Sequence, residues 1–130
     1  MLHHMSLPVA DLERSTRLYD AALGALGYRL VSSSPGFAGY GLEDGKDKLA
    51  LMKVDAPLAA GLGAHLALAA PSREAVDAFH RAALLHGARD NGPPGPRSPY
   101  GPNYYAAFVI DPDGHRLEAV HNPSPDRDST

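Results

Sequence analysis

The chain of 130 residues contains no cysteine, no tryptophan and only three phenylalanines. The lack of cysteine excludes a disulfide framework, a thiolate nucleophile and any zinc or iron–sulfur site that is built on sulfur. A metal ion bound by this protein must therefore be held by histidine, aspartate or glutamate side chains.

The sequence also lacks a long apolar run and an excess of basic charge. No segment approaches the roughly 20 apolar residues of a membrane span, and the N-terminus MLHHMSLPV has neither a basic start nor a long apolar segment. Twelve basic and fifteen acidic side chains give a net charge of −3 without a run of either sign. We therefore expect a cytoplasmic protein that binds neither nucleic acid nor a membrane.

What the chain does contain is an internal repeat. Residues 4–11, HMSLPVAD, alternate like a strand and lead through an N-capping Asp11 into a segment with apolar residues at helical spacing. Residues 65–72, HLALAAPS, repeat this plan with Ser72 as the cap. His4 falls on His65 at the same offset, so the two segments indicate a duplicated unit of strand and helix.

Each predicted helix is followed by strand-like segments that turn residues separate. We expect an α+β fold of two βαβββ modules. The modules should occupy about residues 2–56 and 62–122, with helices near 11–26 and 72–87. The stretch 92–103, GPPGPRSPYGPN, is interpreted as a stiff surface loop, and residues 123–130 as a polar tail.

The segments HMSLPVADLERSTRLYDAALGALGY and YYAAFVIDPDGHRLEAV resemble the vicinal oxygen chelate superfamily. That superfamily includes glyoxalase I, extradiol dioxygenases, fosfomycin-resistance transferases and bleomycin-resistance proteins. The resemblance implies that the two modules form curved mixed sheets around a cup, which holds a divalent metal. It also implies a homodimer, in which a module of one chain completes the cup with a module of the other.

Strand alternation selects the residues that would face such a cup. Leu7, Leu66 and Leu117 are expected to pack against the helices, which turns His4, His65 and Glu118 to the opposite face. Two imidazoles and one carboxylate leave open positions on a divalent ion such as Fe, Mn, Zn, Ni or Co. The resemblance therefore implies His4, His65 and Glu118 as the metal ligands.

One position departs from the glyoxalase I pattern. The carboxylate that glyoxalase I carries on the last strand of its first half matches Ala50 here. In glyoxalase I this acid is tied to moving the substrate proton, so its replacement argues against the same reaction. The remaining set of two histidines and one glutamate is closer to the dioxygenase and fosfomycin-transferase branches.

Other polar residues near the predicted cup are weaker candidates for catalysis. Tyr104 and Tyr105 begin the strand beside Glu118, and alternation turns one of them to the cup; we take Tyr105 forward, together with Arg116 on the face of Glu118. Four of the other histidines are interpreted as ordinary surface or hydrogen-bonded residues: His3, His80, His86 and His115.

Two classes of function remain open from the sequence. The first is a metal-dependent enzyme, such as a lyase, dioxygenase or transferase, that holds a small oxygen-rich or aromatic substrate. The second is a binding protein of the bleomycin-resistance kind, whose cup sequesters a small molecule without a metal. The sequence does not select a substrate or a reaction within the first class.

Overall fold

A computed structural model describes residues 1–56 and 64–124, and it shows an α+β fold in which one plan is used twice. The boundary that we predict between the modules and most of the predicted tail lie outside these residues. The first half consists of β1 (Met5–Val9), α1 (Leu12–Gly24), β2 (Arg29–Ser34), β3 (Phe37–Glu43) and β4 (Lys46–Lys53).

The second half repeats the order of strand, helix and further strands. The predicted stiff loop is partly regular here, because it contains a two-residue strand and a short 3-10 helix. The elements are β5 (Leu66–Ala69), α2 (Arg73–Leu85), β6 (Arg89–Asp90), β7 (Gly95–Pro96), the 3-10 helix η1 (Ser98–Tyr100), β8 (Tyr105–Ile110) and β9 (Arg116–His121).

Both helices begin where the sequence predicts. The side chain of Asp11 accepts a hydrogen bond from the backbone N–H of Arg14 at 3.0 Å, and Ser72 caps α2 through the N–H of Ala75 at 3.1 Å. Neither helix is long and apolar enough to cross a membrane, within the residues that the structure describes.

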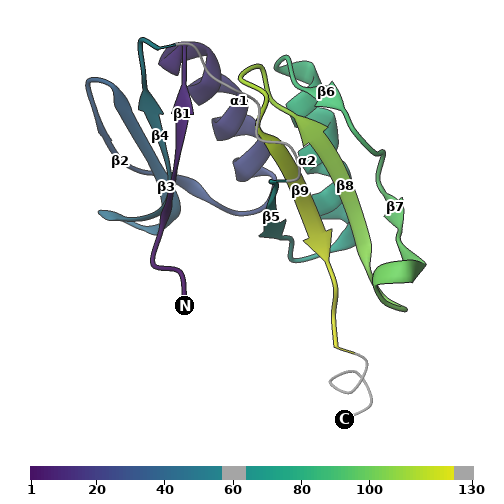
Figure 1. Cartoon of the computed structure of the whole chain (residues 1–130). Helices are drawn as coiled ribbons and strands as arrows, with labels where there is room; N and C mark the ends of the chain where they lie inside the picture. The colour runs from purple at the N-terminus through teal and green to yellow at the C-terminus, as the bar shows by residue number, and fades with distance from the viewer. Residues whose placement is uncertain (57–63, 125–130) are drawn as a thin grey trace.

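The strands form two separate mixed sheets. Sheet A has the order β1-β4-β3-β2, sheet B has the order β5-β9-β8-β6, and β7 adds to the side of β8. Each half therefore joins its first strand in parallel to its last strand. Each helix packs on the sheet of its own half and on the other helix, so one apolar core spans both halves (Figure 1).

We call the face of each sheet that is turned away from the helices its outer face. The predicted alternation is observed: Leu7, Val9 and Leu117 lie in the core, on the helix side. Register places Ser6 beside Ala50 on the outer face of sheet A, and Ala67 beside Glu118 on the outer face of sheet B. These two outer faces are the surfaces on which the cup residues were expected.

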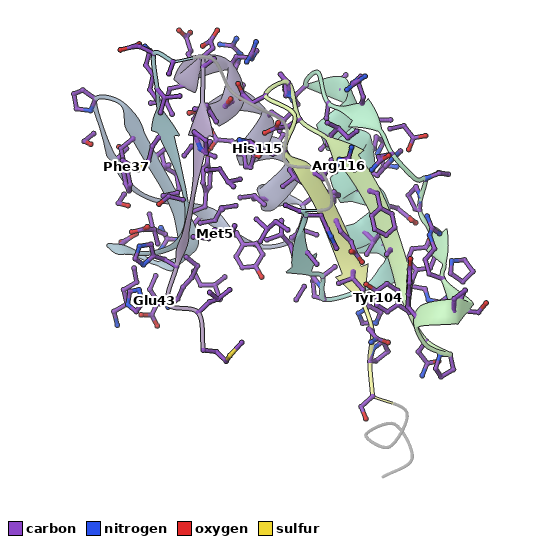
Figure 2. All side chains as sticks on the ribbon, viewed as in Figure 1. Met5, Phe37, Glu43, Tyr104, His115 and Arg116 are labelled. Carbon is purple, nitrogen blue, oxygen red and sulfur yellow. The ribbon has the colours of Figure 1, made fainter. Side chains whose placement is uncertain are left out.

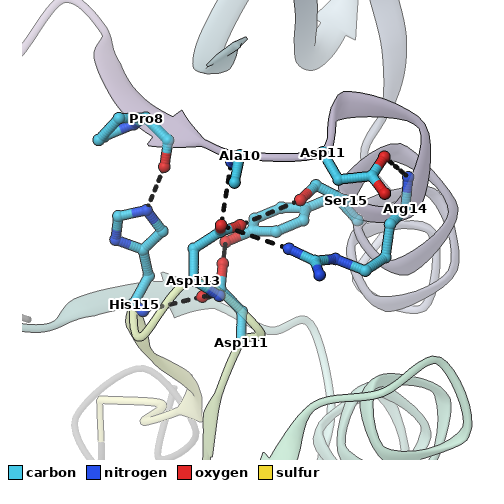
Figure 3. A network of polar contacts seen from close by, with 9 residues as sticks. Pro8, Ala10, Asp11, Arg14, Ser15, Asp111, Asp113 and His115 are labelled. Carbon is cyan, nitrogen blue, oxygen red and sulfur yellow. Dashed lines mark hydrogen bonds and ion pairs between the residues drawn. The ribbon is translucent and has the colours of Figure 1, made fainter. Parts of the chain in front are cut away.

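The turn between β8 and β9 joins the two halves of the molecule (Figure 3). Asp111, only 2% exposed, accepts hydrogen bonds from the backbone N–H groups of Asp113 at 2.9 Å and His115 at 2.8 Å. Its other carboxylate oxygen accepts a hydrogen bond from the hydroxyl of Tyr19 in α1 at 2.6 Å. One buried acid thus shapes the turn of the second half and anchors the helix of the first.

The second acid of this turn strengthens the same joint. Asp113 accepts hydrogen bonds from the backbone N–H of Ala10 at 3.0 Å and from the hydroxyl of Ser15 at 3.2 Å. Arg14 approaches the same carboxylate at 3.4 Å, and the side chain of His115 donates to the carbonyl of Pro8 at 2.6 Å. The DPDG turn therefore holds the loop between β1 and α1 in place.

We expect Tyr19→Phe to lower the free energy of unfolding by about 1–3 kcal/mol, because it leaves one oxygen of a buried carboxylate without its donor. The substitution keeps the ring and its packing, so the loss reports the hydrogen bond. Urea unfolding at neutral pH measures it. Tyr100→Phe is the matched control, since that side chain is 66% exposed; equal losses in both variants would contradict the assigned role.

High pH gives a second measurement of the same contact. Burial and the neighbouring Asp111 raise the pKa of Tyr19 well above its usual value. Unfolded tyrosine ionises at about pH 10, so the folded state binds more protons above that pH and stability falls as the pH rises further. This fall should be smaller in Tyr19→Phe than in the wild type.

Candidate functional site

Glu118 is a buried acid on the outer face of sheet B. It lies in the middle of β9, with Ala67 of β5 beside it on one side and Phe108 of β8 on the other. The residue is only 2% exposed. A carboxylate in such a position needs polar partners, because the burial of an unpaired charge costs free energy.

Two side chains contact the carboxylate of Glu118. Nε2 of His65 lies 3.1 Å from its Oε1, and the hydroxyl of Tyr104 donates a hydrogen bond to its Oε2. The imidazole of His65 is half-exposed at the start of β5. Among the described residues, no lysine or arginine pairs with Glu118. The acid thus meets an imidazole and a phenol, and it meets no guanidinium or ammonium group within this part of the chain.

The structure decides which of the two adjacent tyrosines lies at this site. Tyr105, the residue that we carried forward from the sequence, points to the helix side, donates to Asp77 at 2.6 Å and lies under Arg73. Tyr104 is the one beside Glu118. Burial and the hydrogen bond to Glu118 raise the pKa of Tyr104 to about 12, so the phenol keeps its proton at neutral pH.

Arg116 lies on the same face as Glu118 but toward the other end of the sheet from Tyr104 (Figure 2). It lines a hollow of about 160 Å³ together with His65, Asn91 and Phe108. The aromatic wall of this hollow is supported from the loop, because the guanidinium of Arg97 lies 5.4 Å from the centre of the Phe108 ring. Arg116 is therefore a neighbour of His65 and not a partner of Glu118.

His4 lies on the other sheet. It precedes β1 and borders a hollow of about 600 Å³ on the outer face of sheet A, which Ser6 and Ala50 also line. Its Nδ1 is 2.8 Å from Nδ1 of His3, so His3 is in contact with it. Residues 1–56 and 64–124 contain no group of three histidine, aspartate or glutamate side chains placed to hold one metal ion. The chain brings His65 and Glu118 together and leaves His4 apart from them.

The remaining histidines make structural contacts. His80 is nearly buried on α2 and lies 2.9 Å from the carboxylate of Asp90, and His86 forms the C-cap of that helix. His115 belongs to the joint between the halves. These roles agree with the interpretation from the sequence.

Comparison with known proteins identifies the family. The sequence model of the Glyoxalase/Bleomycin resistance protein/Dioxygenase superfamily matches residues 1–119, which is most of the chain. The chain belongs to this superfamily. A glyoxalase/bleomycin resistance protein from Albidiferax ferrireducens T118 has 33% identity and a TM-score of 0.81, with 93% of this chain and 98% of that chain covered. No curated protein matched the sequence.

Two solved structures of lower sequence identity share the fold. FosX, a fosfomycin resistance protein from Mesorhizobium loti, has 23% identity and a TM-score of 0.68, over 98% of this chain and 96% of that chain. A FosX variant from Listeria monocytogenes, complexed with Mn(II) and 1S,2S-dihydroxypropylphosphonic acid, has 20% identity and a TM-score of 0.65, over 92% and 87%. At these identities the likeness concerns the fold.

Two buried acids of this chain should respond differently to loss of charge. Glu118→Gln keeps an acceptor for Tyr104 and removes a buried charge, so we expect unchanged stability or a gain of up to about 1 kcal/mol. Asp111→Asn places an amide N–H₂ where oxygens accept three donors, and it should cost about 1–3 kcal/mol. Urea unfolding of both variants measures the contrast. A large loss in Glu118→Gln would mean that Glu118 serves the fold.

Proposed function

We propose that this protein is a divalent-metal-dependent enzyme that acts on a small molecule, with His65 and Glu118 as the ligands from the second half. The observation that supports this most is the buried carboxylate of Glu118, which faces outward beside the imidazole of His65 and has no lysine or arginine of the described chain against it. Such a carboxylate stabilises neither a helix nor a turn. Its burial is explained if a bound cation offsets its charge.

The chemistry of the donor set fits a divalent ion. Imidazole nitrogen and carboxylate oxygen together suit iron, manganese and zinc, and one carboxylate with two histidines leaves positions open for a substrate. A metal held there would act as a Lewis acid toward two adjacent oxygens of a small substrate. His65 and Glu118 supply two ligands, and His4 is the third in our proposal.

The neighbours of the two ligands have defined tasks in this proposal. Tyr104 donates a hydrogen bond to one oxygen of Glu118, which fixes the carboxylate and leaves its other oxygen toward His65. Because its pKa is raised, the phenol stays a donor throughout the physiological range. Arg116 and Phe108 line the hollow next to His65, where they would contact a substrate that reaches past the ligands.

We propose further that the site is shared between two copies of the chain. His4 lies on sheet A, whereas His65 and Glu118 lie on sheet B, and both outer faces are free of helices. A homodimer that sets sheet A of one copy against sheet B of the other would bring the three ligands together twice. This arrangement is a symmetric one, as in most soluble homo-oligomers.

Metal binding tests the first proposal. Protein purified without a histidine tag should bind Mn²⁺, and Glu118→Gln and His65→Ala should each weaken binding by at least about 10-fold, because each removes one ligand. Mn²⁺ binding is measured from the loss of the electron paramagnetic resonance signal of the free ion. His86→Ala, on the surface at the end of α2, is the matched control. Retention of Mn²⁺ by all variants would leave a metal-free binding cup as the better account.

Mixed dimers test the shared site. His4→Ala and Glu118→Gln chains should each bind little Mn²⁺ alone. After the two are unfolded and refolded together, random pairing should restore about a quarter of the wild-type sites, since each mixed dimer contains one intact site. A mixture that binds no more than its separate components would contradict a site between subunits. Sedimentation velocity of the same samples gives the oligomeric state.

A further inference from the structure

Strand β3 carries two glycines on the outer face of sheet A, Gly39 and Gly41. Glycine weakens a strand, and in a sheet it marks a bulge or a close approach of other atoms. Both reasons apply here. A Cβ at Gly39 would lie 2.5 Å from Oγ of Ser32 and 2.8 Å from Cβ of Asp47, and a Cβ at Gly41 would lie 2.6 Å from the carbonyl oxygen of Lys46. Gly39 thus makes room for the side chains of Ser32 and Asp47, and Gly41 makes room for the backbone of Lys46.

A β-bulge directs Asp47 into this space. Along β3 and β4, Tyr40 pairs with Leu49, but the next pair joins Gly41 to Asp47 and leaves Lys48 as an extra residue. Simple alternation from Leu49 would turn Asp47 to the helix side. The extra residue moves it to the outer face, in line with the use of bulges to re-aim a side chain.

A second bulge lies on the opposite side of β3. Leu30 pairs with Tyr40, whereas Ser32 pairs with Gly39, so Val31 is the extra residue on β2. The hydroxyl of Ser32 is buried and makes no hydrogen bond to any residue that the structure describes. Two bulges therefore bring a carboxylate and an unsatisfied hydroxyl over the same glycine.

Asp47 faces the hollow that His4 borders. The hollow of about 600 Å³ on sheet A is lined by both residues, and by Ala50, whose neighbour on β3 is Gly39. No hydrogen bond or ion pair of the Asp47 carboxylate exists within residues 1–56 and 64–124. The chain thus presents a carboxylate and an imidazole on one face; Lys46 and Lys48 also line this hollow, but neither pairs with the carboxylate of Asp47 within the described residues.

Asp47 differs in this respect from the acids around it. Asp44, at the tip of the same hairpin, pairs with Arg29 at 2.6 Å, and Glu43 pairs with Lys46 at 3.0 Å. An acid that served the turn would bond to backbone N–H groups or to a neighbouring cation. Asp47 does neither in the described chain, although the bulge in β4 and the glycine at position 39 both serve to place its side chain.

We propose that Asp47 is the carboxylate that the first half contributes, together with His4, to the divalent-cation site. It would provide from a different position the acid that is missing at Ala50. This inference rests on the proposed metal site. Carboxylate oxygen and imidazole nitrogen, which lie here on one face, are ligands that bind Mn²⁺ and Fe²⁺.

Mn²⁺ affinity of single variants tests the inference. Asp47→Asn keeps the size of the side chain and should weaken Mn²⁺ binding about 10-fold or more, because it removes one charged oxygen from the ion. Glu43→Gln is the matched control, because it removes one charge from the same hairpin. This variant should bind Mn²⁺ with the affinity of the wild type. Asp47→Asn that binds Mn²⁺ as tightly as the wild type overturns the inference.

A steric variant tests the role of the bulges independently. Gly39→Ala adds a methyl group that collides with Asp47 and Ser32, so it should weaken Mn²⁺ binding, whereas Gly24→Ala adds one in open space and should not. Circular dichroism compares the fold of all variants. If Gly39→Ala does not fold, the Mn²⁺ affinity of Asp47→Asn alone decides the test. If the wild-type protein does not bind Mn²⁺, both the proposed function and this inference are overturned. Binding that depends on Glu118 and not on Asp47 overturns this inference alone.

Discussion

The arrangement of the two halves depends on the buried carboxylate of Asp111. It closes its own turn with two backbone N–H groups and accepts the phenol of Tyr19 from the other half. Asp113 adds contacts to the loop before α1. Because both acids have hydrogen-bond partners inside the protein, the turn fixes the start of β9 relative to α1. The orientation of sheet B relative to sheet A follows from this contact and from the packing of the two helices.

The same arrangement leaves the chemistry on the outer faces. The helices and the apolar sides of both sheets form one core, so the ionisable side chains proposed as ligands lie on the opposite side of the strands. Glu118 is buried although it lies on that side, because Phe108 and Tyr104 lie next to it. A binding site formed in this way needs a second surface to close it. The proposal of a shared site between two copies follows from that geometry.

The sequence predicted the parts of the fold that depend on periodicity and local turn chemistry. Short-range patterns predicted the helix caps, the strand faces and the duplication. The caps are Asp11 and Ser72, and the strand faces are those of Leu7 and Leu117. The side of Tyr104 was also within reach. In YYAAFVI, the residues Ala107 and Val109 share the parity of Tyr105 and lie in the core, which leaves Tyr104 to the outer face.

Two features could not be predicted in this way. DPDG indicates a turn, but its contacts with Tyr19 and Ser15 join residues almost a hundred positions apart and depend on tertiary packing. The bulges in β2 and β4 break the alternation from which faces are predicted. Alternation counted from Leu49 assigns Asp47 to the wrong side, and only the observed register corrects it.

That bulge also affects how relatives of this protein are compared. An alignment places residues in columns by order along the chain, and the column of Ala50 contains no acid in this protein. A bulge changes which column faces a given point in space, so a side chain three columns earlier can reach the same region. Members of the superfamily sorted by the residue in one column would therefore be grouped by strand register as much as by chemistry. Grouping by the residues that share an outer face avoids this error.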